Sequence, residues 1–218
     1  MDIIKLKEEQ LKLAKKISLE DGFSEINLIA GADQIMVGDS ILSVIVVLDA
    51  ESLKIVDAAH VVQKPKFKYI PGLLAYRESP IMVEAFSKLR RRPDLLFVKG
   101  NGILHPRGIG LASHVGLLLD VPTIGVAKKL VLGKEEQEAL YIDDKLVGFS
   151  LMTREHAKPI YISPGHLISL DSAREVTERF CIGQKMPEPL HIAHRMGAKL
   201  KRPLNQEGIE DSGISQKE

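Results

Sequence analysis

Three polar side chains in this sequence stand at the ends of apolar runs, where enzymes often present catalytic groups. Asp33 lies in "LIAGADQ", Lys99 follows "DLLFV", and Lys128 follows "PTIGVA". A carboxylate can bind a divalent metal ion, and an amine can offer a point charge to a phosphate. Taken singly, Asp33 also fits a turn-forming residue and Lys128 a solvated cation, so both interpretations stay open for each residue.

Further candidates stand between these runs. Glu78 precedes a helix start predicted at Ser79 and Pro80, where it would either bind a metal or interact with the helix dipole. His105 stands beside Arg107 in "GNGILHPRG", and a neutral imidazole next to a fixed cation suits the handling of phosphate or water. The alternative for His105 is an ordinary surface histidine.

His166 follows a Pro-Gly pair in "SPGHLISLDSA", and Asp171 is expected to cap the next helix. Two acids are thus followed along the chain by histidines and a lysine. This order suits phosphodiester hydrolysis in which one or two metal ions activate water and neutralise charge on the phosphate.

The segment Tyr69, Ile70, Pro71 and Gly72 has neither helix nor strand periodicity. It predicts a rigid loop that exposes an aromatic ring, and such a ring can stack on a base or wedge between bases. The alternative is a simple Pro-Gly turn with the tyrosine folded inward.

The apolar periodicity predicts a mixed α/β sheet that would position these groups. An antiparallel meander opens the chain, and alternating helices and strands then add parallel strands, with helices on the faces of the sheet. We expect one domain over residues 1–202 and a disordered tail over 203–218. The expected helices are 3–19, 80–91, 108–120 and 171–182, and the expected strands are 26–32, 41–48, 54–62, 94–100, 122–128, 138–143, 145–153 and 158–162.

Composition excludes several classes of protein. The 218 residues include 44% hydrophobic and 27% charged residues with a net charge of +1, which is typical of a soluble globular domain. The one cysteine, Cys181, excludes an internal disulfide and fits a reducing compartment, so we expect a cytoplasmic monomer with no membrane partner. Any surface that binds nucleic acid must come from local clusters of lysine and arginine.

The segments "LIAGADQ", "KYIPGLLAYRESP", "PDLLFVKGNGILHPRGIGLASHVGLLLDVPTIGVAKK", "SPGHLISLDSA" and "MPEPLHIAH" together resemble the endonuclease V family. The resemblance implies a ribonuclease-H-like fold and a DNA repair endonuclease. Such an enzyme recognises deoxyinosine in DNA, or inosine in RNA for some members, and uses Mg²⁺ or Mn²⁺ to cut the second phosphodiester bond on the 3′ side.

The same resemblance implies roles for individual residues. Asp33 and Glu78 match metal-binding acids, and His105, Lys128 and His166 match catalytic positions around the phosphate path. The residues matched to the base wedge and to nucleic-acid binding are Tyr69, Ile70, Pro71, Gly72, Gly102 and Arg107.

One position departs from the family pattern. Similar family members read Val-Asp-Gly where this chain reads Val98-Lys99-Gly100, and that aspartate is a principal metal ligand. An ammonium has no lone pair for a metal, and one unit charge about 4 Å from a divalent ion is worth roughly 8 kcal/mol at an effective dielectric constant near 20. We therefore expect impaired metal chemistry. Four explanations stay open. Lys99 is an introduced inactivating change, or it is natural in a relative that only binds inosine. Alternatively, its amine replaces the positive charge of the metal, or another carboxylate such as Asp171 acts as the metal ligand.

Overall fold

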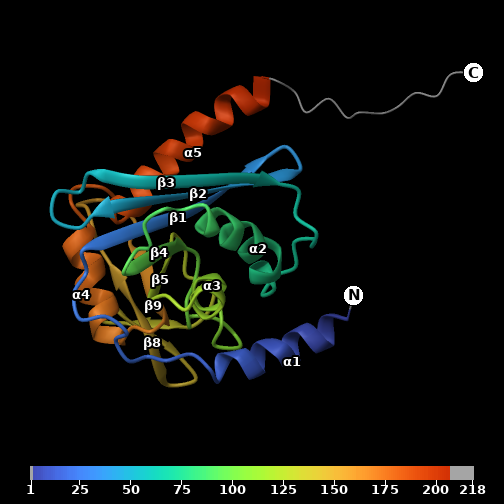
Figure 1. The fold of residues 1–218 in the computed structure, drawn as a ribbon. Coiled ribbons are helices and arrows are strands. Elements are labelled where there is room, and N and C mark those ends of the chain that lie inside the picture. Colours follow the sequence, from blue (N-terminus) through green and yellow to red (C-terminus); the bar gives the residue numbers. More distant parts are fainter. Residues whose placement is uncertain (1, 207–218) are drawn as a thin grey trace, which may run out of the picture.

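The computed structural model describes residues 2–206 and is built on one mixed β-sheet. Its nine strands lie in the order β3-β2-β1-β4-β5-β9-β8-β7-β6 (Figure 1). Strands β1, β4 and β5 run parallel at the centre, and the other neighbouring pairs are antiparallel. The strands are β1 (Leu28–Val37), β2 (Ser40–Asp49), β3 (Ile55–Gln63), β4 (Leu95–Lys99), β5 (Thr123–Ala127), β6 (Lys134–Glu136), β7 (Ala139–Ile142), β8 (Lys145–Leu151) and β9 (Ile160–His166).

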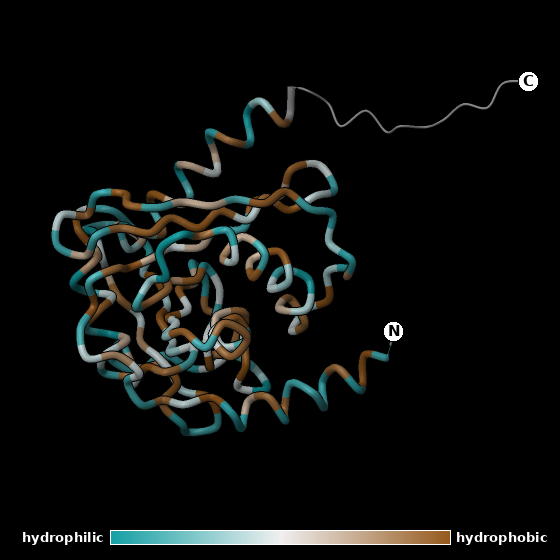
Figure 2. Tube along the Cα trace, in the orientation of Figure 1, coloured by the Kyte–Doolittle hydropathy of each residue, from teal (hydrophilic) through white to brown (hydrophobic). Residues whose placement is uncertain are grey.

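Helices cover both faces of this sheet. The covering helices are α2 (Leu74–Ser87), α3 (Leu111–Leu119), α4 (Leu170–Phe180) and α5 (Glu188–Gln206), and a further helix, α1 (Ile3–Ala14), lies outside these layers. One core packs α2 and α3 against the sheet, and a second core on the other face packs α4 and α5 (Figure 1). Figure 2 shows hydrophobic residues concentrated in the central strands and in α3, whereas polar and apolar residues alternate along α1.

The predicted meander and the mixed sheet are both present. Strands β1, β2 and β3 pair antiparallel in sequence order, and β4 and β5 extend the sheet in parallel. The sequence did not predict β6, a three-residue edge strand of polar residues. Within residues 2–206, no helix is both long enough and apolar enough to cross a membrane.

The predicted start of α2 is wrong by six residues. The helix begins at Leu74, so Pro80 lies inside it and Glu78 is a helical residue rather than a residue before the helix. Ser79 is buried and does not cap the helix. Proline removes one backbone hydrogen bond, and the burial of Ile81 and Met82 against the sheet offsets that cost.

Two expectations near the end of the chain also fail. Ser169, not Asp171, caps α4, because its side chain accepts a hydrogen bond from the backbone N–H of Ser172 and Asp171 lies in the first turn. The sequence did not predict α5, which continues through residues 203–206 of the segment expected to be disordered. The rest of that segment, 207–218, lies outside the described residues.

Candidate active site

Asp33 is the most deeply buried charged residue of the candidate site, with 0% of its side chain exposed. It does not end its strand, because β1 continues to Val37 and Asp33 pairs with Val44 of β2. A carboxylate held in the middle of a central strand needs partners, because an unpaired buried charge is strongly unfavourable.

Two cationic or polar side chains supply those partners. The Lys99 ammonium donates to Oδ1 of Asp33 at 2.6 Å, and Nδ1 of His194 lies 2.6 Å from Oδ2. Both carboxylate oxygens are therefore occupied by groups of the protein itself. Lys99 remains 31% exposed and His194 51% exposed, so this buried carboxylate is covered by two residues that reach solvent.

The backbone explains why these three groups meet. Strands β1 and β4 are parallel neighbours with Ala32 opposite Val98, which places the next residue of each strand, Asp33 and Lys99, side by side. Helix α5 crosses β1 directly over Gly31, where a Cβ atom would collide with the backbone of Pro189. This close approach brings the following turn of α5, which carries His194, over Asp33.

Glu78 completes the group from α2. The pKa of its carboxyl group is raised to about 7, mainly by burial and to a smaller extent by the nearby Asp33, whereas Arg77 and Lys99 lower it. Glu78 is therefore near enough to Asp33 and Lys99 for their charges to affect its carboxyl group. The two predicted acids and the lysine that replaces the third thus converge from separate parts of the chain.

These side chains do not fit a divalent metal ion. Lys99 has no lone pair to offer a metal, and its ammonium is already hydrogen-bonded to Oδ1 of Asp33. Within residues 2–206, no group of three or more His, Cys, Asp or Glu side chains is arranged to hold a metal. The residues present at Asp33 therefore do not match the Mg²⁺ or Mn²⁺ site that the family resemblance implies.

A cavity of about 160 Å³ opens beside this centre. Lys128, which follows β5 and is exposed, lies at the cavity with Lys99, as the sequence predicted for two neighbouring strand ends. The residues lining it are Lys99, Lys128, Arg154, Gln184, Lys185, Met186, Leu190, His191 and His194. The sequence reasoning missed His194, although the pair His191 and His194, three residues apart, places both rings on one side of a helix.

The loop before α2 holds an exposed aromatic ring, as one of the two open interpretations predicted. Tyr69 is 65% exposed, whereas Phe67 nearby is buried. The loop is fastened at both ends: Arg77 donates to the carbonyl of Phe67 at 2.8 Å, and the carbonyl of Gly72 accepts several hydrogen bonds. We call residues 67–72 the wedge loop.

Three side chains converge on the carbonyl of Gly72. The donors are Nε2 of Gln10 at 3.1 Å and Nη2 of Arg107 at 2.6 Å, and Nε2 of His105 lies 3.2 Å away. Nδ1 of His105 accepts from the backbone N–H of Arg107, which leaves Nε2 to carry the proton. Burial, with a smaller contribution from Arg107, lowers the pKa of His105 to about 4, so the ring is neutral at physiological pH.

His105 therefore supports the wedge loop instead of joining Asp33 and Lys99. It lies with Tyr69, Gly72 and Arg107 around a second cavity of about 410 Å³. Leu104, Ile109, Leu111 and Val131 contribute apolar surface to this cavity. Its apolar walls and polar rim at Gly72 are typical of a site for a flat, partly polar ligand.

Two predicted residues lie elsewhere. His166 pairs with Thr123 at the start of β5, whereas Lys128 follows the end of that strand, so the two lie at opposite ends of β5. Nδ1 of His166 accepts from the backbone N–H of Ser18, a structural role that sequence could not separate from a catalytic one. Gly102 is buried, and a Cβ atom there would collide with the carbonyl of Pro164, so this glycine allows close packing on β9.

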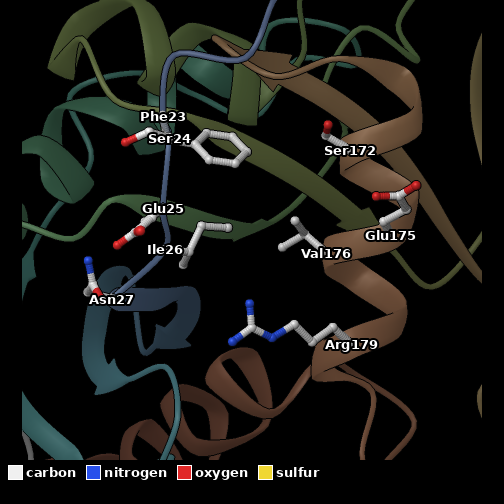
Figure 3. A pocket seen from close by; sticks show the side chains of 9 residues that line it. All are labelled: Phe23, Ser24, Glu25, Ile26, Asn27, Ser172, Glu175, Val176 and Arg179. Carbon is white, nitrogen blue, oxygen red and sulfur yellow. The ribbon is translucent and has the colours of Figure 1, made fainter.

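A further pocket lies between the segment preceding β1 and helix α4. Figure 3 shows Phe23 and Ile26 from that segment facing Val176 of α4, with Arg179 at one end. The nine residues that line it include none of the predicted site residues.

Comparison with known proteins assigns the family. The Endonuclease V family model matches residues 11–195. The chain is 43% identical to Endonuclease V of Thermosipho melanesiensis over 92% of each chain. Its structure is similar to that of Endonuclease V from Streptomyces avermitilis, with a TM-score of 0.84, 32% identity and coverage of 90% of this chain and 91% of that one.

A third structure is that of Ciona intestinalis Endonuclease V in complex with a 24mer DNA containing an inosine followed by a ribo-adenosine. The TM-score is 0.81 at 25% identity, and the match covers 93% of this chain and 98% of that one. The predicted ribonuclease-H-like mixed sheet is confirmed by its match to the solved endonuclease V structures. The chain belongs to the endonuclease V family.

Proposed function

We propose that this protein recognises inosine in nucleic acid and that Lys99 disables the metal-dependent hydrolysis expected of its family. The observation that carries the proposal is the pairing of Lys99 with Asp33 in a protein whose wedge loop exposes Tyr69. The wedge loop presents Tyr69 to solvent, where it can engage a base, whereas the charge of the Asp33 carboxylate is already balanced by Lys99.

The recognition half of the proposal is supported by the wedge loop and the cavity beneath it. Tyr69 stands exposed at a mostly apolar cavity, and the Ciona relative was solved with inosine-containing DNA. An exposed ring can stack in the place of a base that has left the helix, and a flipped base would find apolar walls and the polar rim at Gly72. Deoxyinosine in DNA is the proposed ligand, and inosine in RNA is the second ligand to compare.

Binding measurements test recognition directly. A labelled duplex with one deoxyinosine is compared with the same duplex carrying adenosine, in the presence of EDTA. The protein is expected to prefer deoxyinosine, and Tyr69→Ala is expected to weaken binding about tenfold, equivalent to about 1.4 kcal/mol, because base stacking is lost. Tyr69→Phe keeps the ring and serves as the matched control. Equal affinity for the two duplexes would remove the recognition half of the proposal.

A nicking assay tests the hydrolysis half. With Mg²⁺ or Mn²⁺ the unmodified protein is expected to leave the deoxyinosine duplex intact, and Lys99→Asp is expected to nick the second phosphodiester bond 3′ to the lesion. Lys54→Asp is the control, because it makes the same charge change in the turn between β2 and β3. The end of β2 that leads into this turn pairs with the start of β1, so Lys54→Asp should not confer nicking. Nicking by the unmodified protein at a rate close to that of Lys99→Asp would contradict the proposal.

A further inference from the structure

The cavity beside Asp33 is lined by cations from four separate parts of the chain. Lys99 ends β4, Lys128 follows β5, Arg154 follows β8, and Lys185 precedes α5. Among the described residues, no aspartate or glutamate lines this cavity. Such a concentration of positive charge in a concave site favours an anion.

The carboxylate behind the cavity does not oppose that charge. Asp33 is fully buried, and both of its oxygens face Lys99 and His194. An ammonium has three N–H donors, and Asp33 is the one hydrogen-bond partner seen for Lys99 within residues 2–206. Because Lys99 also lines the cavity, its remaining donors are available to a ligand there.

A hydrogen bond links two of the segments that line the cavity. Oγ1 of Thr153 donates to the backbone carbonyl of Lys185 at 2.8 Å, which ties the segment carrying Arg154 to the segment carrying Lys185. A guanidinium fork can bind two oxygens of one phosphate group, and a lysine supplies a point charge. The cavity of about 160 Å³ holds the volume of about five water molecules at about 30 Å³ each, which is room enough for one phosphate group.

We propose that this cavity binds a backbone phosphate of nucleic acid without a divalent ion, with Lys99 supplying positive charge where related enzymes use a metal. The proposal rests on the proposed function, because that function makes nucleic acid the partner. It goes further by assigning the family's metal-binding position to direct phosphate binding in this chain.

Fluorescence anisotropy with the deoxyinosine duplex tests the proposal by its dependence on metal and salt. The dissociation constant of the unmodified protein is expected to agree within twofold in EDTA and in Mg²⁺. Lys99→Met should weaken binding about tenfold in both, and should lower the slope of log affinity against log salt by about one, because one phosphate contact is lost. Lys99→Asp should weaken binding in EDTA, with at least tenfold recovery in Mg²⁺.

Two further variants keep the test independent of the stability of the Asp33 centre. Lys185→Gln removes another cation that lines the cavity and should also reduce the salt slope, whereas Lys54→Met, outside the cavity lining, should change neither affinity nor slope. Melting curves establish that each variant is folded. A tenfold loss of affinity in EDTA for the unmodified protein would overturn the proposal, as would unchanged slopes for both Lys99→Met and Lys185→Gln.

The two proposals fail in different ways. Loss of the phosphate contact should weaken binding to the deoxyinosine and adenosine duplexes by the same factor, since a phosphate carries no base identity. A protein that shows this uniform, metal-independent effect but no preference for deoxyinosine would support the phosphate site and refute inosine recognition. A preference for deoxyinosine that requires Mg²⁺ would support inosine recognition and refute the metal-independent phosphate site.

Discussion

Lys99 donates a 2.6 Å hydrogen bond to Asp33 across the parallel strands β4 and β1, so an ammonium stands beside the carboxylate that the sequence predicts to bind a metal. The two residues are neighbours by register, and neither depends on a flexible loop for its position. The pair therefore forms part of the folded core, and its removal has consequences for stability as well as for ligand binding.

Removing the amine should destabilise the protein. Lys99→Met leaves the buried carboxylate of Asp33 with His194 alone, and loss of one partner of a buried ion pair costs about 3–5 kcal/mol. We expect about 3 kcal/mol, the low end, because Lys99 is 31% exposed. Chemical denaturation measures the change. Lys64→Met breaks an exposed pair with Asp39 and should have a far smaller effect, so equal losses for the two variants would contradict a buried-pair effect.

Introducing a carboxylate should make stability respond to metal. Lys99→Asp brings a third acid to Asp33 and Glu78, and these would repel one another until a divalent ion binds. An ion at 100 times its dissociation constant stabilises a folded protein by about 2.7 kcal/mol. Mn²⁺ should therefore raise the melting temperature of Lys99→Asp and leave that of the unmodified protein unchanged. An equal rise in both would show that the metal binds elsewhere.

The backbone of Gly72 offers a test of the wedge loop. Its φ angle is +77°, and a Cβ atom would lie 2.7 Å from Nη2 of Arg107, within the group of donors on its carbonyl. Gly72→Ala should lose about 1–2 kcal/mol from the left-handed backbone and about 1 kcal/mol more for each hydrogen bond displaced.

Gly38→Ala is the matched control, because Gly38 also has a positive φ angle, +57°, with no atom within 4 Å of the added Cβ. Denaturation of both variants separates backbone strain from loss of the contacts of Gly72. Duplex binding should fall for Gly72→Ala. If Gly72→Ala lost no more stability than Gly38→Ala, the hydrogen bond from Arg107 to Gly72 would not stabilise the wedge loop.

Acid should weaken the fold through His105. Its pKa is lowered from 6.5 to about 4, so between these values the unfolded chain takes up a proton that the folded protein does not. The contribution of His105 to stability is present above pH 6.5 and is lost as the pH falls toward 4. The slope is at most about 1.4 kcal/mol per pH unit, and less because the ring is partly exposed.

His105→Gln should flatten the pH dependence of unfolding over this interval, because the amide can still donate to the carbonyl of Gly72 and does not titrate there. The exposed His60, changed to Gln, is the control and should leave the dependence as it is. Identical slopes for His105→Gln and the unmodified protein would show that His105 is not held neutral.

The sequence predicted the meeting of Asp33 and Lys99 because neighbouring parallel strands bring their ends to one edge. It placed Asp33 at a strand end, however, since "GAD" looks like a turn, whereas pairing with β2 carries β1 to Val37. The exposed ring of Tyr69 was one of two interpretations, and the choice depends on contacts of Gly72 with Gln10 and Arg107, which are 62 and 35 residues away. Such distant contacts leave no local pattern.

His194 and His166 show two ways in which prediction of the site from sequence fails. No helix was predicted over α5, so the ring that contacts Asp33 was missed, although a proline in a first helical turn, such as Pro189, is well tolerated. His166 stood next to a Pro-Gly pair and was predicted to be catalytic, but Pro164 and Gly165 lie within β9 and carry it away from the site. In both cases the residue type suggested chemistry, and only the path of the backbone decided where the ring lies.

The pairing of Lys99 with Asp33 also bears on how the protein behaves in changing surroundings. A centre built from carboxylates alone is complete only after an ion arrives from solution, so its readiness follows the supply of that ion. Here the counter-charge is encoded in the chain and is delivered by the same β-sheet pairing that creates the need for it. The site is therefore assembled as soon as the protein has folded, whatever the concentration of magnesium around it.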